Sequence, residues 1–276
     1  FLRHISLSAN QLSGNIPTSL GQLTRMVTLN LYLNELRGTI PAELRSLTAL
    51  ETLGLSANRL SGEIPFELSR LNRLQSLDLE LNKLKGRWPV ELVRLSSLLY
   101  LDVSDNLFSG IAIPSEFGRL EHLKKAGLSN CGLQGSIPTE FGMLSNLEYL
   151  ELSKNGMNGP LPSEIGRMQN LLWLSVSNNE LTSTLPKELV QITALQVLDV
   201  SSNKLSGTIP QEYGMFRSYQ SKFDFRGNNN LFGPIPQDFC EAVCCTEGAI
   251  LVNGSISPCD VGCSTCDESF ARDGGF

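Results

Sequence analysis

The chain has 276 residues and a formal net charge of −6, and it is longer than the roughly 100–150 residues of a usual single-core domain. The negative charge provides no electrostatic attraction toward nucleic acid or an anionic membrane, so the sequence predicts neither as a partner. No segment approaches the ~20 consecutive apolar residues of a transmembrane helix, and no membrane span is expected within this chain.

A proline recurs along almost the whole chain at a nearly constant interval. The prolines are Pro17, Pro41, Pro65, Pro89, Pro114, Pro138, Pro162, Pro186, Pro210 and Pro236, separated by 24, 24, 24, 25, 24, 24, 24, 24 and 26 residues. Self-similarity at such a period predicts a solenoid, in which each repeat packs only against its neighbours. We therefore expect about ten stacked repeats, with loop insertions at Gly110–Pro114 and Arg226–Leu231.

Each repeat is expected to begin with a short strand, as the unit Leu50-x-x-Leu53-x-Leu55-x-x-Asn58-x-Leu60-x-Gly62 illustrates. The alternation around Leu53 and Leu55 predicts one buried and one open strand face. Stacked strands form a parallel sheet over a continuous core, where each buried leucine contributes ~1.5–3 kcal/mol. The recurrent asparagine is expected to bond backbone groups after the strand. The recurrent glycine is expected to adopt a positive φ.

The pattern Leu-x-x-Leu-x-Leu-x-x-Asn-x-Leu-x-Gly-x-Ile-Pro resembles the plant-type leucine-rich repeat. That family includes receptor-kinase ectodomains, polygalacturonase-inhibiting proteins and related secreted proteins of plants and some algae. The resemblance covers residues 1–239. It implies an α/β class fold, namely a right-handed leucine-rich-repeat solenoid with a parallel concave β-sheet and short 3-10 or irregular convex segments. The paired-cysteine N-terminal cap of the family is absent, so the first repeat is expected to need a preceding segment or to fray.

Residues 240–276 are expected to form a separate, cysteine-rich C-terminal cap on the last repeat. Six of the seven cysteines lie here, at Cys240, Cys244, Cys245, Cys259, Cys263 and Cys266. Such density predicts disulfides and an oxidising, extracellular or cell-surface location, with the pairing left open. Zinc held by Cys263-x-x-Cys266 is the alternative, although the adjacent Cys244 and Cys245 suit a closed site poorly. Asn253 begins the sequon Asn-Gly-Ser and is a predicted glycosylation site.

The remaining cysteine, Cys131, stands where other repeats carry the recurrent asparagine. We interpret it as a buried free thiol. A cysteine nucleophile needs a nearby histidine, and the chain has only His4 and His122. The sequence therefore predicts no catalytic residue, no metal and no cofactor.

The open strand face holds the candidate binding residues, at the third and fifth positions of each repeat. The third positions of repeats five to eight are Tyr100, Lys125, Tyr149 and Trp173, and the neighbouring fifth positions include Asp78, Asp102 and Glu151. Large aromatic side chains on an open sheet favour a binding role, and Lys125 is expected to lie between two tyrosine rings. Stacked aromatics beside carboxylates would suit a protein, a peptide or a sugar.

Simpler interpretations of the same residues stay open. Tyr100, Lys125 and Tyr149 would also stack on one another as cross-strand neighbours. The acidic patch consists of Glu51, Asp78, Glu80, Asp102 and Asp105, and the open-face positions of repeats three to five hold no lysine or arginine, so the patch would favour a basic partner. A Ca²⁺ site there, or a glycosidase-like carboxylate pair, is weaker because nothing in the sequence indicates an enclosed pocket.

The favoured function is an extracellular recognition module, either a receptor ectodomain or a secreted binder of a protein, peptide or glycan. A structural or adhesive protein that assembles with itself or a matrix is the first alternative. An inhibitor of a cell-wall hydrolase is the second, and it depends on family analogy alone.

Overall fold

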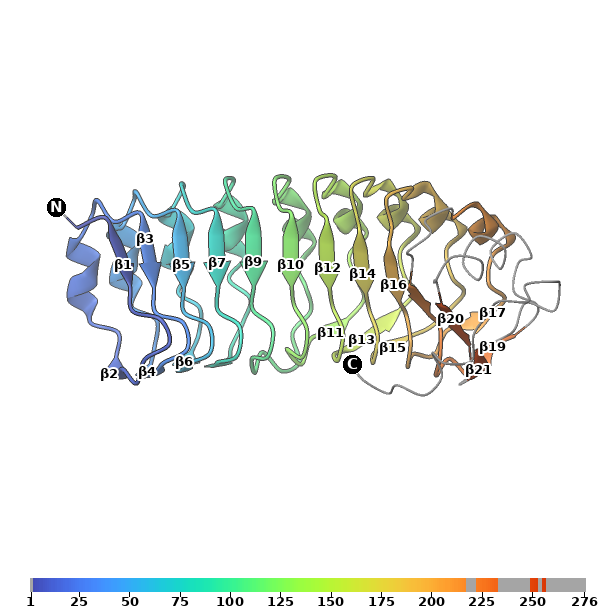
Figure 1. Cartoon of the computed structure of the whole chain (residues 1–276), viewed down its shortest axis with the longest axis horizontal. Helices are drawn as coiled ribbons and strands as arrows, with labels where there is room; N and C mark the ends of the chain where they lie inside the picture. The colour runs from blue at the N-terminus through green and yellow to red at the C-terminus, as the bar shows by residue number, and fades with distance from the viewer. Residues whose placement is uncertain (1, 217–221, 233–248, 253–254, 257–276) are drawn as a thin grey trace.

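The computed structural model describes residues 2–216 and 222–232, and the backbone of residues 249–252 and 255–256. These residues form an elongated solenoid in which each repeat contributes one strand to a single long sheet (Figure 1). The strands of this main sheet are, in spatial order, β1 (His4–Ser6), β3 (Thr28–Asn30), β5 (Thr52–Gly54), β7 (Ser76–Asp78), β9 (Tyr100–Asp102), β10 (Lys125–Gly127), β12 (Tyr149–Glu151), β14 (Trp173–Ser175), β16 (Val197–Asp199), β18 (Lys222–Asp224), β20 (Ala249–Val252) and β21 (Ser255–Ile256). The pairs from β1 to β20 are parallel, which confirms the predicted solenoid sheet.

On the other side of the solenoid, a 3-10 helix follows each of the repeat prolines from Pro17 to Pro210 (Figure 1). The helices are η1 (Thr18–Gln22), η2 (Ala42–Ser46), η3 (Phe66–Arg70), η4 (Val90–Arg94), η5 (Ser115–Arg119), η6 (Thr139–Met143), η7 (Ser163–Arg167), η8 (Lys187–Gln191) and η9 (Gln211–Met215). Pro65 precedes η3 with φ −63°, which is the angle that its ring imposes and that a helix start tolerates. The short 3-10 segments expected opposite the sheet are thus confirmed.

Three further ladders of short parallel strands run along one edge of the solenoid, and the sequence pattern did not predict them. They contain β2 (Ser13–Asn15), β4 (Glu35–Gly38), β6 (Arg59–Gly62) and β8 (Lys83–Leu84), then β11 (Gln134–Gly135), β13 (Gly156–Gly159) and β15 (Glu180–Leu181), then β17 (Ser206–Gly207) and β19 (Asn230–Leu231). Segments of two to four residues are too short to carry an alternating pattern. They become strands only because equivalent segments stack.

The core fills the space between the main sheet and the 3-10 helices. The repeat leucines are inside, and Leu50, Leu53 and Leu55 are completely buried. In the middle repeats the core also contains aromatic rings, and Phe117 stacks on Phe141 with 5.2 Å between ring centroids. Such aromatic pairs add to the stabilisation from burial alone.

The recurrent asparagines form a buried ladder, as predicted. In Asn58, Nδ2 donates to the carbonyls of Leu55, Ser56 and Leu31, while Oδ1 accepts from the Leu36 amide at 3.0 Å. Asn228 also joins the ladder and is fully buried, although the sequence placed it in a loose insertion. The asparagine matters because a side chain such as that of Asn58 satisfies backbone groups of two repeats at once.

Several predictions concern residues outside the described part of the chain. The six cysteines Cys240, Cys244, Cys245, Cys259, Cys263 and Cys266 and the sequon Asn253 are among them, so the disulfides and the glycosylation stay predictions. The domain division at residues 239 and 240 also stays a prediction. The backbone of β20 pairs with β18. Within the described residues, no helix has the length and apolar character needed to cross a membrane.

Candidate ligand-binding face

The four predicted third-position residues form one row across neighbouring strands. Tyr100 of β9 is in register with Lys125 of β10, which is in register with Tyr149 of β12, followed by Trp173 of β14. All three rings face solvent, with 47 % of Tyr100, 43 % of Tyr149 and 37 % of Trp173 exposed. We call the surface that carries the third and fifth positions the sheet face. Neighbouring members of the row stand ~4.8 Å apart along it.

Lys125 has the predicted backbone position between two tyrosines, but its ammonium is directed elsewhere. Its Nζ lies 2.9 Å from Oδ2 of Asp102 on the neighbouring strand. Burial disfavours the ammonium, but the hydrogen bond to Asp102 and the charges of the nearby carboxylates, that of Asp102 first, together outweigh this effect, so the pKa of Lys125 is raised. The aromatic row is therefore interrupted by an ion pair rather than a cation stacked between rings.

A glycine makes room for this ion pair. Gly127, at the fifth position of β10, is in register with Asp102, and a Cβ on Gly127 would collide with the Asp102 carboxylate. The carboxylate therefore leans over the glycine toward Lys125. The same carboxylate accepts the Ser104 amide through Oδ1 at 3.1 Å, so Asp102 is held at both oxygens.

Trp173 is also fixed by a carboxylate on the adjacent strand. Its indole Nε1 donates to Oε2 of Glu151 at 2.9 Å, and the other oxygen of Glu151 accepts the Ser129 hydroxyl at 3.1 Å. The indole consequently presents a flat apolar surface whose polar edge is already satisfied. Such a ring loses little conformational entropy when a ligand covers it.

The acidic patch predicted around β7 and β9 exists, but it is not free of basic residues. Burial, then the charges of Asp102 and Asp78, raise the pKa of Glu80. Lys125, from the following repeat, enters the patch and opposes that rise. Among the residues that the structure describes, no group of three or more histidine, cysteine or acidic side chains is arranged to hold a metal ion.

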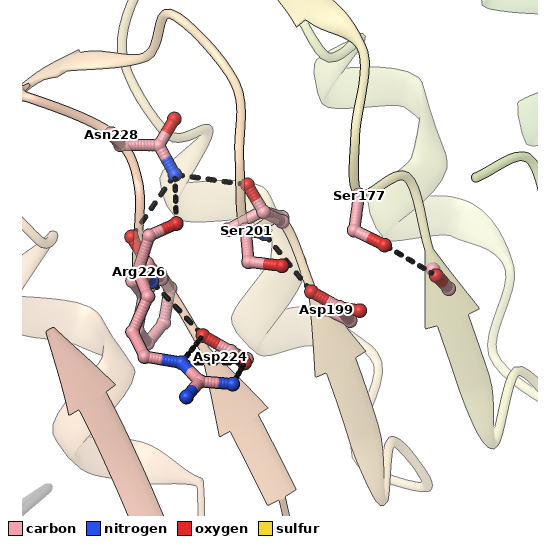
Figure 2. A network of polar contacts seen from close by, with 9 residues as sticks. Ser177, Asp199, Ser201, Asp224, Arg226 and Asn228 are labelled. Atoms are coloured by element: carbon pink, nitrogen blue, oxygen red, sulfur yellow. Dashed lines mark hydrogen bonds and ion pairs between the residues drawn. The ribbon is translucent and has the colours of Figure 1, made fainter. Parts of the chain in front are cut away.

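Fifth-position side chains have a structural role that the repeat pattern did not predict. Asp199 and Asp224 are the last residues of β16 and β18, and each accepts a hydrogen bond from the backbone amide two residues later (Figure 2). The distances are 3.0 Å from the Ser201 amide and 2.9 Å from the Arg226 amide. Arg226 also folds back so that Nη2 lies 2.6 Å from Oδ2 of Asp224. Acidic residues and asparagine suit this position because they bond their own backbone two residues on.

Cys131 matches its predicted state as a buried free thiol. Its sulfur lies 3.1 Å from the carbonyl of Val103 and 3.3 Å from that of Ser129. Burial raises the pKa of the thiol to about 12. The nucleophilic thiolate is therefore not formed at neutral pH.

Comparisons with known proteins agree with the repeat fold. The family profile described as Leucine Rich Repeat matches residues 1–23, 49–71, 146–168, 170–192 and 194–216. No curated protein sequence matches the chain.

Similar solved structures include several ectodomains of plant receptors. A structure described as a TDR receptor superposes with a TM-score of 0.84 at 31 % identity, covering 92 % of this chain and 45 % of that one. The ectodomain of the Arabidopsis thaliana receptor kinase GASSHO1/SCHENGEN3, solved with CASPARIAN STRIP INTEGRITY FACTOR 2, has a TM-score of 0.79 at 33 % identity, with coverage of 90 % and 33 %. The chain thus spans less than half the length of these receptors. A plant ice-binding protein has a TM-score of 0.70 at 28 % identity, with coverage of 84 % and 74 %.

Proposed function

Because the chain belongs to the leucine-rich-repeat family, with repeats of the plant type, we propose that it is an extracellular or cell-surface module that binds an extended peptide. The peptide lies on the sheet face across β9, β10, β12 and β14. The observation that carries this proposal is the row of three exposed aromatic rings on three of four consecutive repeats. Exposed aromatic clusters on a soluble protein are typical of interaction sites.

The geometry suits a peptide better than an enzyme substrate. The row is exposed to solvent, and its members follow one another at the ~4.8 Å spacing of strands, so an elongated ligand contacts several repeats at once. Trp173 and Lys125 are already held by Glu151 and Asp102, which lowers the entropy lost on binding. The nearby carboxylates of Asp78 and Glu80 favour basic groups on the ligand.

The similarity to receptor ectodomains supports the same class of ligand. One of these ectodomains was solved with CASPARIAN STRIP INTEGRITY FACTOR 2, and another, of the receptor kinase HAESA, was solved with the peptide hormone IDA and a co-receptor. Binding of a protein segment through the sheet face is therefore favoured over binding of a glycan. No catalytic role is proposed for any residue of the chain.

The test starts with peptides selected from a random library on the immobilised chain. Trp173→Ala and Tyr149→Ala should each weaken binding of a selected peptide about tenfold or more, with little change in Tm because both rings are exposed. Phe66→Ala is the matched control, since Phe66 is an exposed aromatic on the opposite side, in η3. Unchanged binding by both sheet-face variants, or an equal loss with Phe66→Ala, would contradict the proposal.

A further inference from the structure

We infer that the chain forms a two-fold symmetric dimer along the edge of the solenoid that carries the short strands, through repeats two to five. Three kinds of side chain follow one another across this edge in repeat four, which reads Asp78-Leu-Glu80-Leu81-Asn-Lys83-Leu-Lys85-Gly-Arg87. Carboxylates come first, an exposed leucine follows, and basic side chains come last. A surface with this order is complementary to a second copy of itself.

The basic side chains are gathered on the first ladder of short strands, beyond the ends of the main strands (Figure 1). Five exposed residues form this group, which we call the basic edge: Arg37, Arg59, Lys83, Lys85 and Arg87. Arg37 of β4 is in register with Arg59 of β6, and like charges opposite one another are unfavourable. Among the described residues, Arg59 alone of the five has an ion pair, with Glu35 at 3.4 Å. The basic edge therefore favours an acidic partner.

The rest of the same edge differs in charge. In the short strands from β11 to β19, the one charged residue is Glu180, and it pairs with Lys204 at 3.2 Å. The excess of unpaired positive charge is thus confined to β4, β6 and β8 and to Arg87, which follows them.

Exposed apolar side chains separate the basic edge from the acidic patch of the sheet face. They are Tyr32, Leu33, Leu81 and Leu107, and 59 % of Leu107 is accessible. Leu33 and Leu81 occupy the turn that follows the main strand, with φ 54°, a conformation that glycine and asparagine adopt more readily. Repeats six and eight have Asn130 and Asn178 at the equivalent turn. A leucine that is exposed in this conformation gains little within its own chain, which indicates contact with another surface.

The symmetry follows from the order of the three groups. A two-fold axis along the turns, parallel to the length of the solenoid, brings each repeat against the same repeat of the second copy. Glu80 then faces Lys83 of the second copy, and Lys83 faces Glu80 of the second copy, because these residues flank Leu81 on its two sides. Leu81 lies at the axis and meets its own equivalent. The flexible stem of lysine lets its ammonium reach across the turn.

A second copy fits this surface better than another acidic partner does. The acidic patch spans repeats three to five and the basic edge spans repeats two to four, so opposite charges are available in the same repeats. An apolar centre with a charged rim is typical of a protein interface. A polyanion on the basic edge would meet the neighbouring carboxylates of Asp78 and Glu80, which would repel it.

The dimer goes beyond the proposed peptide site, because Tyr149 and Trp173 lie on later repeats than the basic edge. Glu80 cannot contact both a second copy and a basic group of a peptide, so a peptide that reaches Glu80 should compete with dimer formation. Only this competition rests on the proposed function. Dimerisation without any peptide binding would leave the inference standing while the proposed function fails.

Sedimentation equilibrium of the whole chain tests the inference. We expect a monomer–dimer equilibrium at ~50 mM salt that shifts toward monomer as salt is added, because exposed ion pairs are screened. A chain that stays monomeric at about 1 mM protein in low salt would overturn the inference. So would a monomer that binds polyglutamate through Lys83, which would assign the basic edge to a different acidic partner.

Leu81→Asn tests the apolar centre without endangering the fold, since asparagine suits the positive φ of this turn. It should raise the dissociation constant of the dimer about tenfold or more. Val90→Asn is the matched control, because Val90 is an exposed apolar residue of the same repeat in η4, on the other side of the solenoid. An unchanged dissociation constant in Leu81→Asn, or an equal increase in both variants, would argue against the interface.

Reversal of the two flanking charges tests the symmetry. Lys83→Glu alone brings two carboxylates together at each contact, and Glu80→Lys alone brings two ammonium groups together. Each variant should therefore be monomeric at concentrations where the unaltered chain is dimeric. An equimolar mixture of the two variants should dimerise again, because every contact then joins opposite charges. A mixture that stays monomeric, with both variants folded by circular dichroism, would overturn the inference.

Discussion

Asp102 leans over Gly127 to reach Lys125, and its Oδ2 lies 2.9 Å from the lysine Nζ. This contact joins two repeats on the face that carries the aromatic row. It exists because one of the two strands has no side chain at its fifth position. The ion pair is partly exposed, with 46 % of the Lys125 side chain accessible, so its energetic weight is small and its effect is mainly on geometry.

Gly127→Ala should break this contact. The new methyl group would occupy the space of the Asp102 carboxylate, and the pKa of Lys125 should fall because burial is then no longer opposed by Asp102. Titration of the lysine by NMR measures the change, and the free energy of unfolding should drop by no more than about 1 kcal/mol beyond the steric effect. Asp102→Asn is the control, because it removes the charge without the collision. An unchanged pKa of Lys125 in both variants would contradict the prediction.

Glu80→Gln should stabilise the protein at neutral pH. The pKa of Glu80 is raised in the fold by burial and by Asp102 and Asp78, so the folded state holds the proton more tightly than the unfolded state. The contribution of Glu80 to the free energy of unfolding is fully favourable below its ordinary pKa of 4.5. This contribution is lost as the pH rises through the higher pKa that Glu80 has in the folded state. The gain from Glu80→Gln in urea unfolding should thus shrink as the pH falls toward 4.5 and below. A gain independent of pH would indicate another cause.

Ser183→Gly should also stabilise the chain. Ser183 has φ 74° in the slot where eight other repeats carry glycine with φ between 75° and 92°, and a side chain in this conformation is strained. Since Ser183 is exposed, the substitution removes strain without losing buried contacts. We expect a gain of about 1 kcal/mol in the free energy of unfolding. The reverse change, Gly159→Ser at φ 75°, should lower the free energy of unfolding by a similar amount. A loss of stability in Ser183→Gly would contradict the interpretation that the backbone of Ser183 is strained.

Asn82→Ala should be among the most destabilising single changes of a polar side chain. Nδ2 of Asn82 donates to the carbonyls of Leu55, Leu79 and Glu80, and Oδ1 accepts the Leu60 amide. Removing the side chain leaves these buried groups unsatisfied, at a cost of roughly 3 kcal/mol. Chemical denaturation measures the loss. Asn10→Ala is the matched control, because Asn10 is exposed and its Nδ2 donates to only two carbonyls, and it should cost much less.

The sequence by itself determined the repeat, the strand positions and the rows of the sheet face. It placed Tyr100, Lys125, Tyr149 and Trp173 on adjacent strands, and the registers agree. This was possible because side chains alternate along a strand and identical repeats stack in register, so equivalent positions become neighbours. The asparagine ladder followed from the same repetition, because an asparagine at the same position of each repeat makes the same hydrogen bonds to the backbone.

Only the tertiary structure decided which partner each polar side chain takes. Lys125 joins Asp102 rather than two rings, Trp173 bonds Glu151, and Asn228 enters the ladder despite the insertion before it. These contacts link residues 22 or 23 positions apart and depend on the space that neighbours leave. Periodicity shows that such residues are neighbours, whereas side-chain rotamers and local packing determine which of them bond.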